Sequence, residues 1–141
     1  MKIVAIVQAR MGSTRLPDKV MKIVAGRPMI EVLLERLSRA KEVDEIVLAT
    51  SVEPRNERLV QHVRELGYRC VQGSEDDVLS RFLEAATQSN ADAVIRITGD
   101  CPLVDPVLVD EAVRRYRAAG ADYFSNVAPP TYPDGLDIEV F

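Results

Sequence analysis

Tryptophan is absent from this chain of 141 residues, and its only histidine and cysteines are His62, Cys70 and Cys101. One histidine and two distant cysteines do not match the ligand spacing of a zinc site, so we expect no Cys/His metal centre and reduced thiols. No apolar run approaches the ~20 residues that span a bilayer. The run after Lys2 is also too short for a secretory signal. These absences predict a cytoplasmic protein of one domain with no membrane partner.

Charge is distributed unevenly along the chain. Residues 1–41 contain nine Lys/Arg and three Asp/Glu, whereas residues 42–141 contain nine Lys/Arg and nineteen Asp/Glu. The net charge of -4 argues against a nucleic-acid partner. A basic N-terminal stretch ahead of an acidic body indicates a local site for a small anionic ligand.

Short β-rich runs alternate with amphipathic helical patterns along the whole sequence. The predicted strands are 2–7, 45–49, 68–71, 93–98, 123–126 and 135–141. The predicted helices are 28–40, 55–66, a segment starting after Asp76 or Asp77 and reaching Thr87, and 106–119. This order predicts an α/β fold of three layers, a mainly parallel sheet with helices on both faces. Ligands of such sheets bind at the carboxyl ends of the strands.

The last predicted strand, 135–141, is apolar, and nothing in the sequence is expected to cover it. A bare terminal strand is an edge that invites pairing with another chain. We therefore expect the chain to be a truncated or minimal form of a larger domain, and the exposed strand would favour a homodimer.

The segment from Gln8 to Lys19 is the strongest candidate for a binding site, as part of a predicted loop, 9–27, that is far longer than the usual ~2–6 residues. Gly12 allows close approach of the backbone to a ligand, and free N–H groups there can cradle phosphate oxygens. The loop carries five basic residues: Arg10, Arg15, Lys19, Lys22 and Arg27. Arginines offer bidentate phosphate contacts and lysine a point charge. A merely solvated basic loop is the alternative, and neither the Walker A nor the dinucleotide pattern is present.

Asp100 follows the apolar strand 93–98 and stands beside Gly99. A carboxylate at a strand's carboxyl end is well placed to hold Mg2+, which favours one or two carboxylates together with substrate phosphates. An aspartate that simply forms the turn is the alternative.

Two further acidic segments are candidates. The segment Gly73–Asp77 precedes the helix that carries Arg81; Asp77 suits a helix cap, and contact with a ribose or base is the sharper alternative. Asp137 and Glu139 share one face of the last predicted strand, where they could bind a hydroxylated substrate or simply face water.

Together these segments resemble a known family. The sequence QARMGSTRLPDK at 8–19, GRPMI at 26–30, RITGDCPL at 96–103 and YPDGLDIEVF at 132–141 resemble the CTP-dependent sugar nucleotidyltransferases. That group includes the 3-deoxy-manno-octulosonate and acylneuraminate cytidylyltransferases. The pattern is most similar to the spore coat polysaccharide biosynthesis protein F group. Asp18 departs from the family, where glycine is common.

The resemblance implies a Rossmann-like nucleotidyltransferase domain over residues 1–141, which transfers a cytidylyl group from CTP to an acidic or modified sugar. Members of the family usually exceed 200 residues, and their later part supplies a dimerisation arm and often a second metal-binding carboxylate. The implied roles divide as follows: catalysis by Arg15, Lys19 and Asp100, with Mg2+ on Asp100; nucleotide binding by Gln8, Ala9, Arg10, Gly12, Ser13, Gly73, Asp77 and Arg81; sugar binding by Asp137 and Glu139.

Two other functions compete with this one. A non-catalytic module would bind CTP without releasing pyrophosphate. A glycosyltransferase that uses a nucleotide-sugar would share the parallel sheet and the metal-binding aspartate. The glycosyltransferase reading ranks lower, because Gly99-Asp100-Cys101 is not the Asp-x-Asp pattern expected after a strand.

Overall fold

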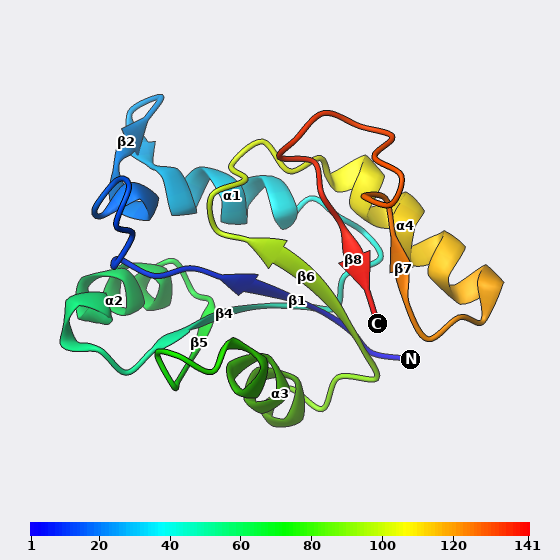
Figure 1. The fold of residues 1–141 in the computed structure, drawn as a ribbon, viewed down its shortest axis with the longest axis horizontal. Coiled ribbons are helices and arrows are strands. Elements are labelled where there is room, and N and C mark those ends of the chain that lie inside the picture. Colours follow the sequence, from blue (N-terminus) through cyan, green and yellow to red (C-terminus); the bar gives the residue numbers. More distant parts are fainter.

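The computed structural model describes residues 1–141 and has a single large sheet at its centre (Figure 1). The strand order is β5-β4-β1-β6-β8-β7. The first four strands of that order run parallel, and β8 runs antiparallel to both β6 and β7. The strands are β1 Ile3–Gln8, β4 Glu45–Ser51, β5 Arg69–Gly73, β6 Ala93–Thr98, β7 Phe124–Ser125 and β8 Glu139–Val140.

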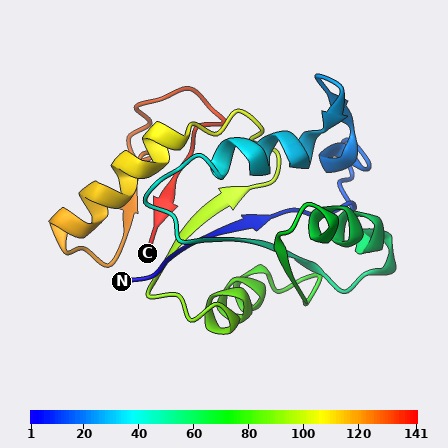
Figure 2. The same cartoon turned by 180° about the vertical axis from the view of Figure 1, so that it is seen from behind.

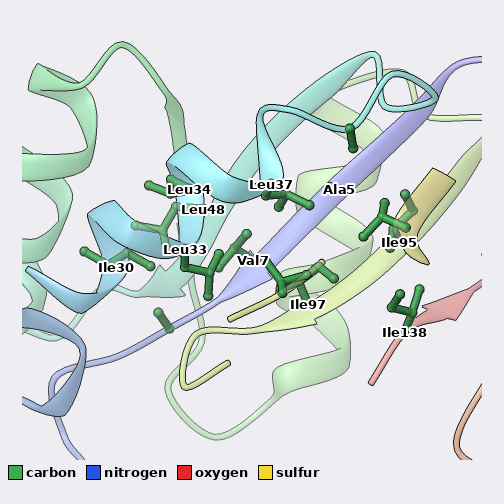
Figure 3. Packing of buried hydrophobic residues seen from close by; sticks show 14 of the residues in the cluster. Ala5, Val7, Ile30, Leu33, Leu34, Leu37, Leu48, Ile95, Ile97 and Ile138 are labelled. Atoms are coloured by element: carbon green, nitrogen blue, oxygen red, sulfur yellow. The ribbon is translucent and has the colours of Figure 1, made fainter. Parts of the chain in front are cut away.

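Helices cover both faces of the sheet, as the sequence predicts (Figures 1 and 2). They are α1 Met29–Leu37, α2 Glu57–Glu65, α3 Val78–Gln88 and α4 Pro106–Ala119. The alternation of side chains along β1 explains the two layers. Ile3, Ala5 and Val7 join the larger core with α1, α2 and α4, and Val4 and Ile6 join the smaller core with α3. Figure 3 shows the larger core, where Leu33 and Leu37 of α1 lie over Val7 and Ile97.

The segment predicted as one long loop, 9–27, contains local structure that the sequence analysis missed. A 3-10 turn, η1 Lys19–Met21, is followed by a small hairpin of β2 Ile23–Val24 and β3 Arg27–Pro28. Ala25 and Gly26 make the hairpin turn with φ of 52° and 81°, the left-handed pair that tight hairpins require. Pro28 is extended and belongs to β3, so the helix predicted from residue 28 begins at Met29; it ends at Leu37 rather than Ala40.

The expectation of an uncovered terminal strand is wrong. Only Glu139–Val140 of the predicted strand 135–141 is β-structure, and it lies between β6 and β7 rather than at an edge. Ile138 and Val140 are 1% and 0% exposed, because both belong to the larger core. The strand therefore offers no open edge, and the reason for expecting a homodimer is removed. None of the helices combines the length and apolar character that crossing a membrane requires.

Candidate functional site

The site lies at the carboxyl ends of β1 and β6, where the order in which strands are added to the sheet reverses. The chain passes from β1 outward to β4 and β5, then returns to place β6 on the other side of β1. The carboxyl ends of β1 and β6 therefore adjoin where the strand order reverses, which is the usual ligand position in open α/β sheets. The Gly99 N–H donates to the Gln8 carbonyl at 2.7 Å and ties the two strand ends together.

A pocket of about 320 Å3 lies at these strand ends. It is lined by Gln8, Ala9, Arg10, Ser13, Thr14, Arg15, Lys19, Val20, Arg96, Thr98, Gly99 and Asp100. Seven of the residues predicted from sequence meet here: Gln8, Ala9, Arg10, Ser13, Arg15, Lys19 and Asp100. Arg96 and Thr98 were not proposed as site residues, although their alternation with apolar neighbours along the strand was a usable signal.

A buried asparagine shapes the start of the basic loop. The Met11 N–H donates to Oδ1 of Asn56 at 2.8 Å, and Nδ2 of Asn56 donates to Oγ of Ser51 at 2.6 Å. The Asp18 N–H donates to the Met11 carbonyl at 3.1 Å and closes the loop on itself. Asp18 has a φ of 56°, a left-handed conformation that aspartate tolerates better than most residues and that glycine adopts freely. Hydrogen bonds within the chain thus define the shape of the loop.

Gly12 packs against the side chain of Arg55 and not against the ligand crevice that the sequence suggested. It does not line the pocket, and a Cβ atom there would lie 2.5–2.8 Å from the guanidinium of Arg55. Nη2 of Arg55 and Nη1 of Arg10 both donate to Oε1 of Glu75, at 3.2 and 2.8 Å. Gly12 therefore makes room for an ion-pair bridge that links the basic loop to the segment after β5.

Lys19 and Asp100 both line the pocket and are in direct contact. Nζ of Lys19 donates to Oδ2 of Asp100 at 3.0 Å. Burial raises the pKa of the Asp100 carboxyl, but the hydrogen bond and charge of Lys19, with the Thr98 hydroxyl, outweigh it and hold that pKa below its ordinary value. Asp100 is therefore a carboxylate at neutral pH.

The donor set bears on whether this pocket fits a metal ion. No three His, Cys, Asp or Glu side chains lie close enough together to form a metal site from the protein alone. Asp100 is the one carboxylate of the lining, and its side chain is half exposed. This arrangement fits Mg2+, which is bound through one or two carboxylates, substrate phosphates and water, and it does not fit a cage made wholly of protein ligands.

The segment after β5 lies outside the pocket lining and is held by its own helix. Oδ1 of Asp77 accepts from the Ser80 N–H at 2.9 Å, so the predicted helix cap is confirmed. Arg81 is 2% exposed and donates to the carbonyls of Ser74 and, at 2.8 Å, Glu75. A Cβ on Gly73 would lie 2.9 Å from Cγ of Arg81. Arg81 and Gly73 therefore shape this loop.

Asp137 and Glu139, the two acids of the last predicted strand, have different surroundings. Asp137 is exposed and follows the residues that line a neighbouring pocket of about 300 Å3, which shares Asp100 with the first. Glu139 does not simply face water, because one carboxylate oxygen accepts from Arg96 and the other from the Tyr123 hydroxyl at 2.6 Å. Burial raises the pKa of Glu139, and the bonds from Tyr123 and Arg96 lower it further than burial raises it.

Gly99 gives a prediction for stability. A Cβ atom at this position would lie 2.5 Å from Cβ of Ala9 and 2.8 Å from the Gln8 carbonyl, and neither can move without shifting β1. Gly99→Ala is expected to lower the free energy of unfolding by about 1–3 kcal/mol, the range for overpacked sites. Urea unfolding followed by circular dichroism measures it.

Gly12→Ala is the matched control for Gly99→Ala, because its added methyl meets only the flexible end of Arg55. We expect it to cost less stability than Gly99→Ala. Equal stability of the Gly99→Ala variant and the wild-type chain would contradict the close approach of β1 and β6.

The chain is similar in sequence to proteins of a known family. A family model described as cytidylyltransferase matches residues 4–133. The spore coat polysaccharide biosynthesis protein SpsF of Bacillus subtilis is 38% identical over 125 residues, 86% of this chain and 52% of that protein. The 3-deoxy-manno-octulosonate cytidylyltransferase of Geobacter sulfurreducens is 38% identical over 115 residues, 80% of this chain and 44% of that protein.

A solved structure agrees with the sequence relatives. A cytidylyltransferase from Leptospira borgpetersenii superposes with a TM-score of 0.94 at 34% identity, over 100% of this chain and 60% of that chain. The chain spans about half the length of the curated relatives it matches. The Leptospira structure thus shares the fold of this chain over its whole length.

Proposed function

The chain belongs to the cytidylyltransferase family, and from this premise we propose that it takes part in transfer of a cytidylyl group from CTP to an acidic sugar. The products are a CMP-sugar and pyrophosphate. The name of its relative SpsF supports polysaccharide synthesis as the setting, and we propose that the reaction takes place in the cytoplasm.

The charge of the pocket is the observation that carries the proposal. Three cations of the basic loop, Arg10, Arg15 and Lys19, line the same crevice as a single carboxylate, Asp100. Such an excess of positive charge at the carboxyl ends of β1 and β6 suits the polyphosphate of a nucleoside triphosphate. Arg15 in particular is exposed, lines the pocket and forms no hydrogen bond or ion pair within the chain, so its guanidinium is free for a ligand.

In the proposed reaction a sugar hydroxyl attacks the α-phosphorus of CTP. The new oxygen–phosphorus bond forms as the bond to the β-phosphate oxygen breaks, the hydroxyl proton passes to solvent, and pyrophosphate leaves. No covalent intermediate on the protein is required. Catalysis by this chain's residues consists of positioning and of neutralising charge: the basic loop holds the phosphates, and Arg15 and Lys19 stabilise the negative charge that develops on the leaving pyrophosphate.

Asp100 would hold a divalent cation, for which Mg2+ is our proposal. A bound Mg2+ supplies Lewis-acid stabilisation of phosphate charge. Nζ of Lys19 lies 3.0 Å from Oδ2 of Asp100, so the side chain proposed to contact the phosphates stands beside the proposed metal ligand. Gly73 and Asp77 are proposed to lie near the nucleoside, and Asp137 near the acceptor.

Specific binding of a nucleotide to the native state raises the apparent stability of a protein. We expect CTP with Mg2+ to raise the Tm of the chain more than ATP, GTP or UTP does at the same concentration. A thermal-shift panel of the four triphosphates measures this. Equal shifts for all four would refute the choice of CTP, and no shift with any would refute the nucleotide site.

A second measurement separates the enzyme from a binding module. Calorimetric titration with CTP is combined with an assay of pyrophosphate release in the presence of 3-deoxy-manno-octulosonate. Binding together with release supports transfer, and binding without release supports a module. Sugar transfer from a nucleotide-sugar without consumption of CTP would instead indicate a glycosyltransferase.

A further inference from the structure

Arg96 is the one cation of the pocket that does not come from the basic loop. It lies inside β6, on the face that Val94 turns toward the smaller core, between the apolar neighbours Ile95 and Ile97. Its side chain is 41% exposed and lines the pocket. A charged residue in the middle of an otherwise apolar strand, open to the ligand crevice, needs an explanation beyond the fold.

Neighbouring strands hold the Arg96 guanidinium on one side. Arg96 is directly opposite Glu139 in the register of β6 and β8, and its Nη1 donates to Oε2 of Glu139. The Tyr123 hydroxyl donates to the other oxygen of Glu139 at 2.6 Å, which fixes the carboxylate in turn. Nε and Nη2 of Arg96 donate to no atom of the chain. The guanidinium is therefore oriented by one bond and keeps free donors for a ligand in the pocket.

The strand order separates the two substrates. Arg10 is paired with Glu75 at 2.8 Å, so the basic loop is tied to the segment after β5, where the nucleoside is proposed to lie. Arg96 lies on the opposite side of β1, toward β8, as the order β5-β4-β1-β6-β8-β7 shows (Figure 1). The neighbouring pocket of about 300 Å3 shares Asp100 and opens between the residues after β6 and those before β8. Arg96 and Asp100 both line the first pocket and Asp100 also lines the neighbouring one, so the two pockets adjoin on the β6 side of the site.

We propose that Arg96 binds the carboxylate of the acceptor sugar, and that Glu139 and Tyr123 are positioning residues that orient its guanidinium. The proposal rests on the proposed function and names the group that this site selects in its acceptor. A guanidinium matches a carboxylate with two parallel hydrogen bonds. A neutral sugar would leave those donors without an anionic partner in a partly enclosed site, and such loss of a partner is what gives polar sites their selectivity.

The test compares two acid sugars with their neutral counterparts. The chain is saturated with Mg2+ and the α,β-methylene analogue of CTP, which cannot react. It is then titrated calorimetrically with 3-deoxy-manno-octulosonate, N-acetylneuraminate and the carboxamide of each. We expect at least one acid to bind about 10- to 100-fold more tightly than its carboxamide, the range for a hydrogen bond to a charged group.

Arg96→Ala is expected to abolish the preference for the acid and to leave the affinity for the nucleotide analogue unchanged. Arg96→Lys should restore part of the preference, because an ammonium keeps the charge and loses the bidentate geometry. Arg58→Ala is the matched control: Arg58 is exposed on α2 and forms no hydrogen bond or ion pair in the chain, so its removal should change neither affinity. Tyr123→Phe should weaken binding of the acid alone, whereas a purely structural tyrosine would affect both ligands.

Three results would overturn the inference. Arg96 does not bind the carboxylate if the wild-type chain shows no preference for either acid, or if the preference persists in Arg96→Ala. Weaker binding of the nucleotide analogue by Arg96→Ala would make Arg96 a phosphate ligand instead. These failures leave CTP binding by the wild-type chain intact, whereas failure of the analogue to bind the wild-type chain refutes the proposed function itself.

Discussion

Replacing Arg15 by alanine is expected to lower the rate of cytidylyl transfer by about 100-fold or more, the loss typical of one group that stabilises charge in the transition state. Arg10 is paired with Glu75 and Lys19 with Asp100, whereas Arg15 has no partner in the chain. Its positive charge is therefore the least compensated among the loop cations that line the pocket. Pyrophosphate release with saturating CTP and Mg2+ measures the effect.

The same substitution should leave stability unchanged within about 0.5 kcal/mol, as is usual for an exposed side chain without contacts. Arg15→Lys should recover part of the rate, because a point charge replaces a bidentate one. Arg58→Ala again serves as the control, since it removes one exposed arginine far from the pocket. Turnover of the Arg15→Ala variant close to that of the wild-type chain would remove Arg15 from the reaction.

Much of this fold could be predicted because its strands are buried on both faces and read as short apolar runs. The strands before residue 100 and all four helices appear near their predicted positions, since periodicity reports which residues turn inward. The terminal strand differs from its prediction because its neighbours in the sheet are distant in the sequence. Its apolar residues were visible in the sequence, but the strands that flank it, β6 and β7, are set by chain topology and not by local pattern.

The candidate site divides in the same way. The carboxyl ends of parallel strands meet at one edge of a sheet, so the sequence could predict that the basic loop and Asp100 lie close together. The partners of individual side chains could not. Glu139 lies 43 residues from Arg96 in the sequence, and the bridge from Arg10 to Glu75 spans 65 residues. From composition alone, each of these four side chains would be expected to be solvated and unpaired. Their pairing depends on strand register and loop shape, which composition does not report.

These internal pairs have a consequence for ligand binding. Lys19 and Asp100 neutralise each other at 3.0 Å, with side chains that are 34% and 51% exposed. An ion pair this exposed contributes little to stability, about 0–1 kcal/mol. The pair keeps opposite charges beside each other at the position where phosphate and cation are proposed to bind. Either partner can therefore be removed with small cost to folding, and its role in binding can be measured cleanly.

Asp100→Asn is expected to lower turnover by about 100-fold or more, because the variant loses the one carboxylate that could hold a metal beside the phosphates. Binding gives a direct test that does not depend on turnover. Calorimetric titration of the wild-type chain should show tighter CTP binding with Mg2+ than with EDTA. In Asp100→Asn this gain should disappear, while CTP binding in EDTA should be unchanged or tighter, since Lys19 is released from its carboxylate.

Asp122→Asn is the control for this experiment. Asp122 is exposed, follows α4 and forms no hydrogen bond in the chain, so its substitution should preserve the gain from Mg2+. Lys19→Met provides the complementary result: it removes a phosphate contact and leaves Asp100 without its cation, so CTP binding should weaken in EDTA and still strengthen when Mg2+ is added. If Asp100→Asn kept the full gain from Mg2+, the cation would be bound by the nucleotide alone, and the carboxylate at the end of β6 would serve only to hold Lys19.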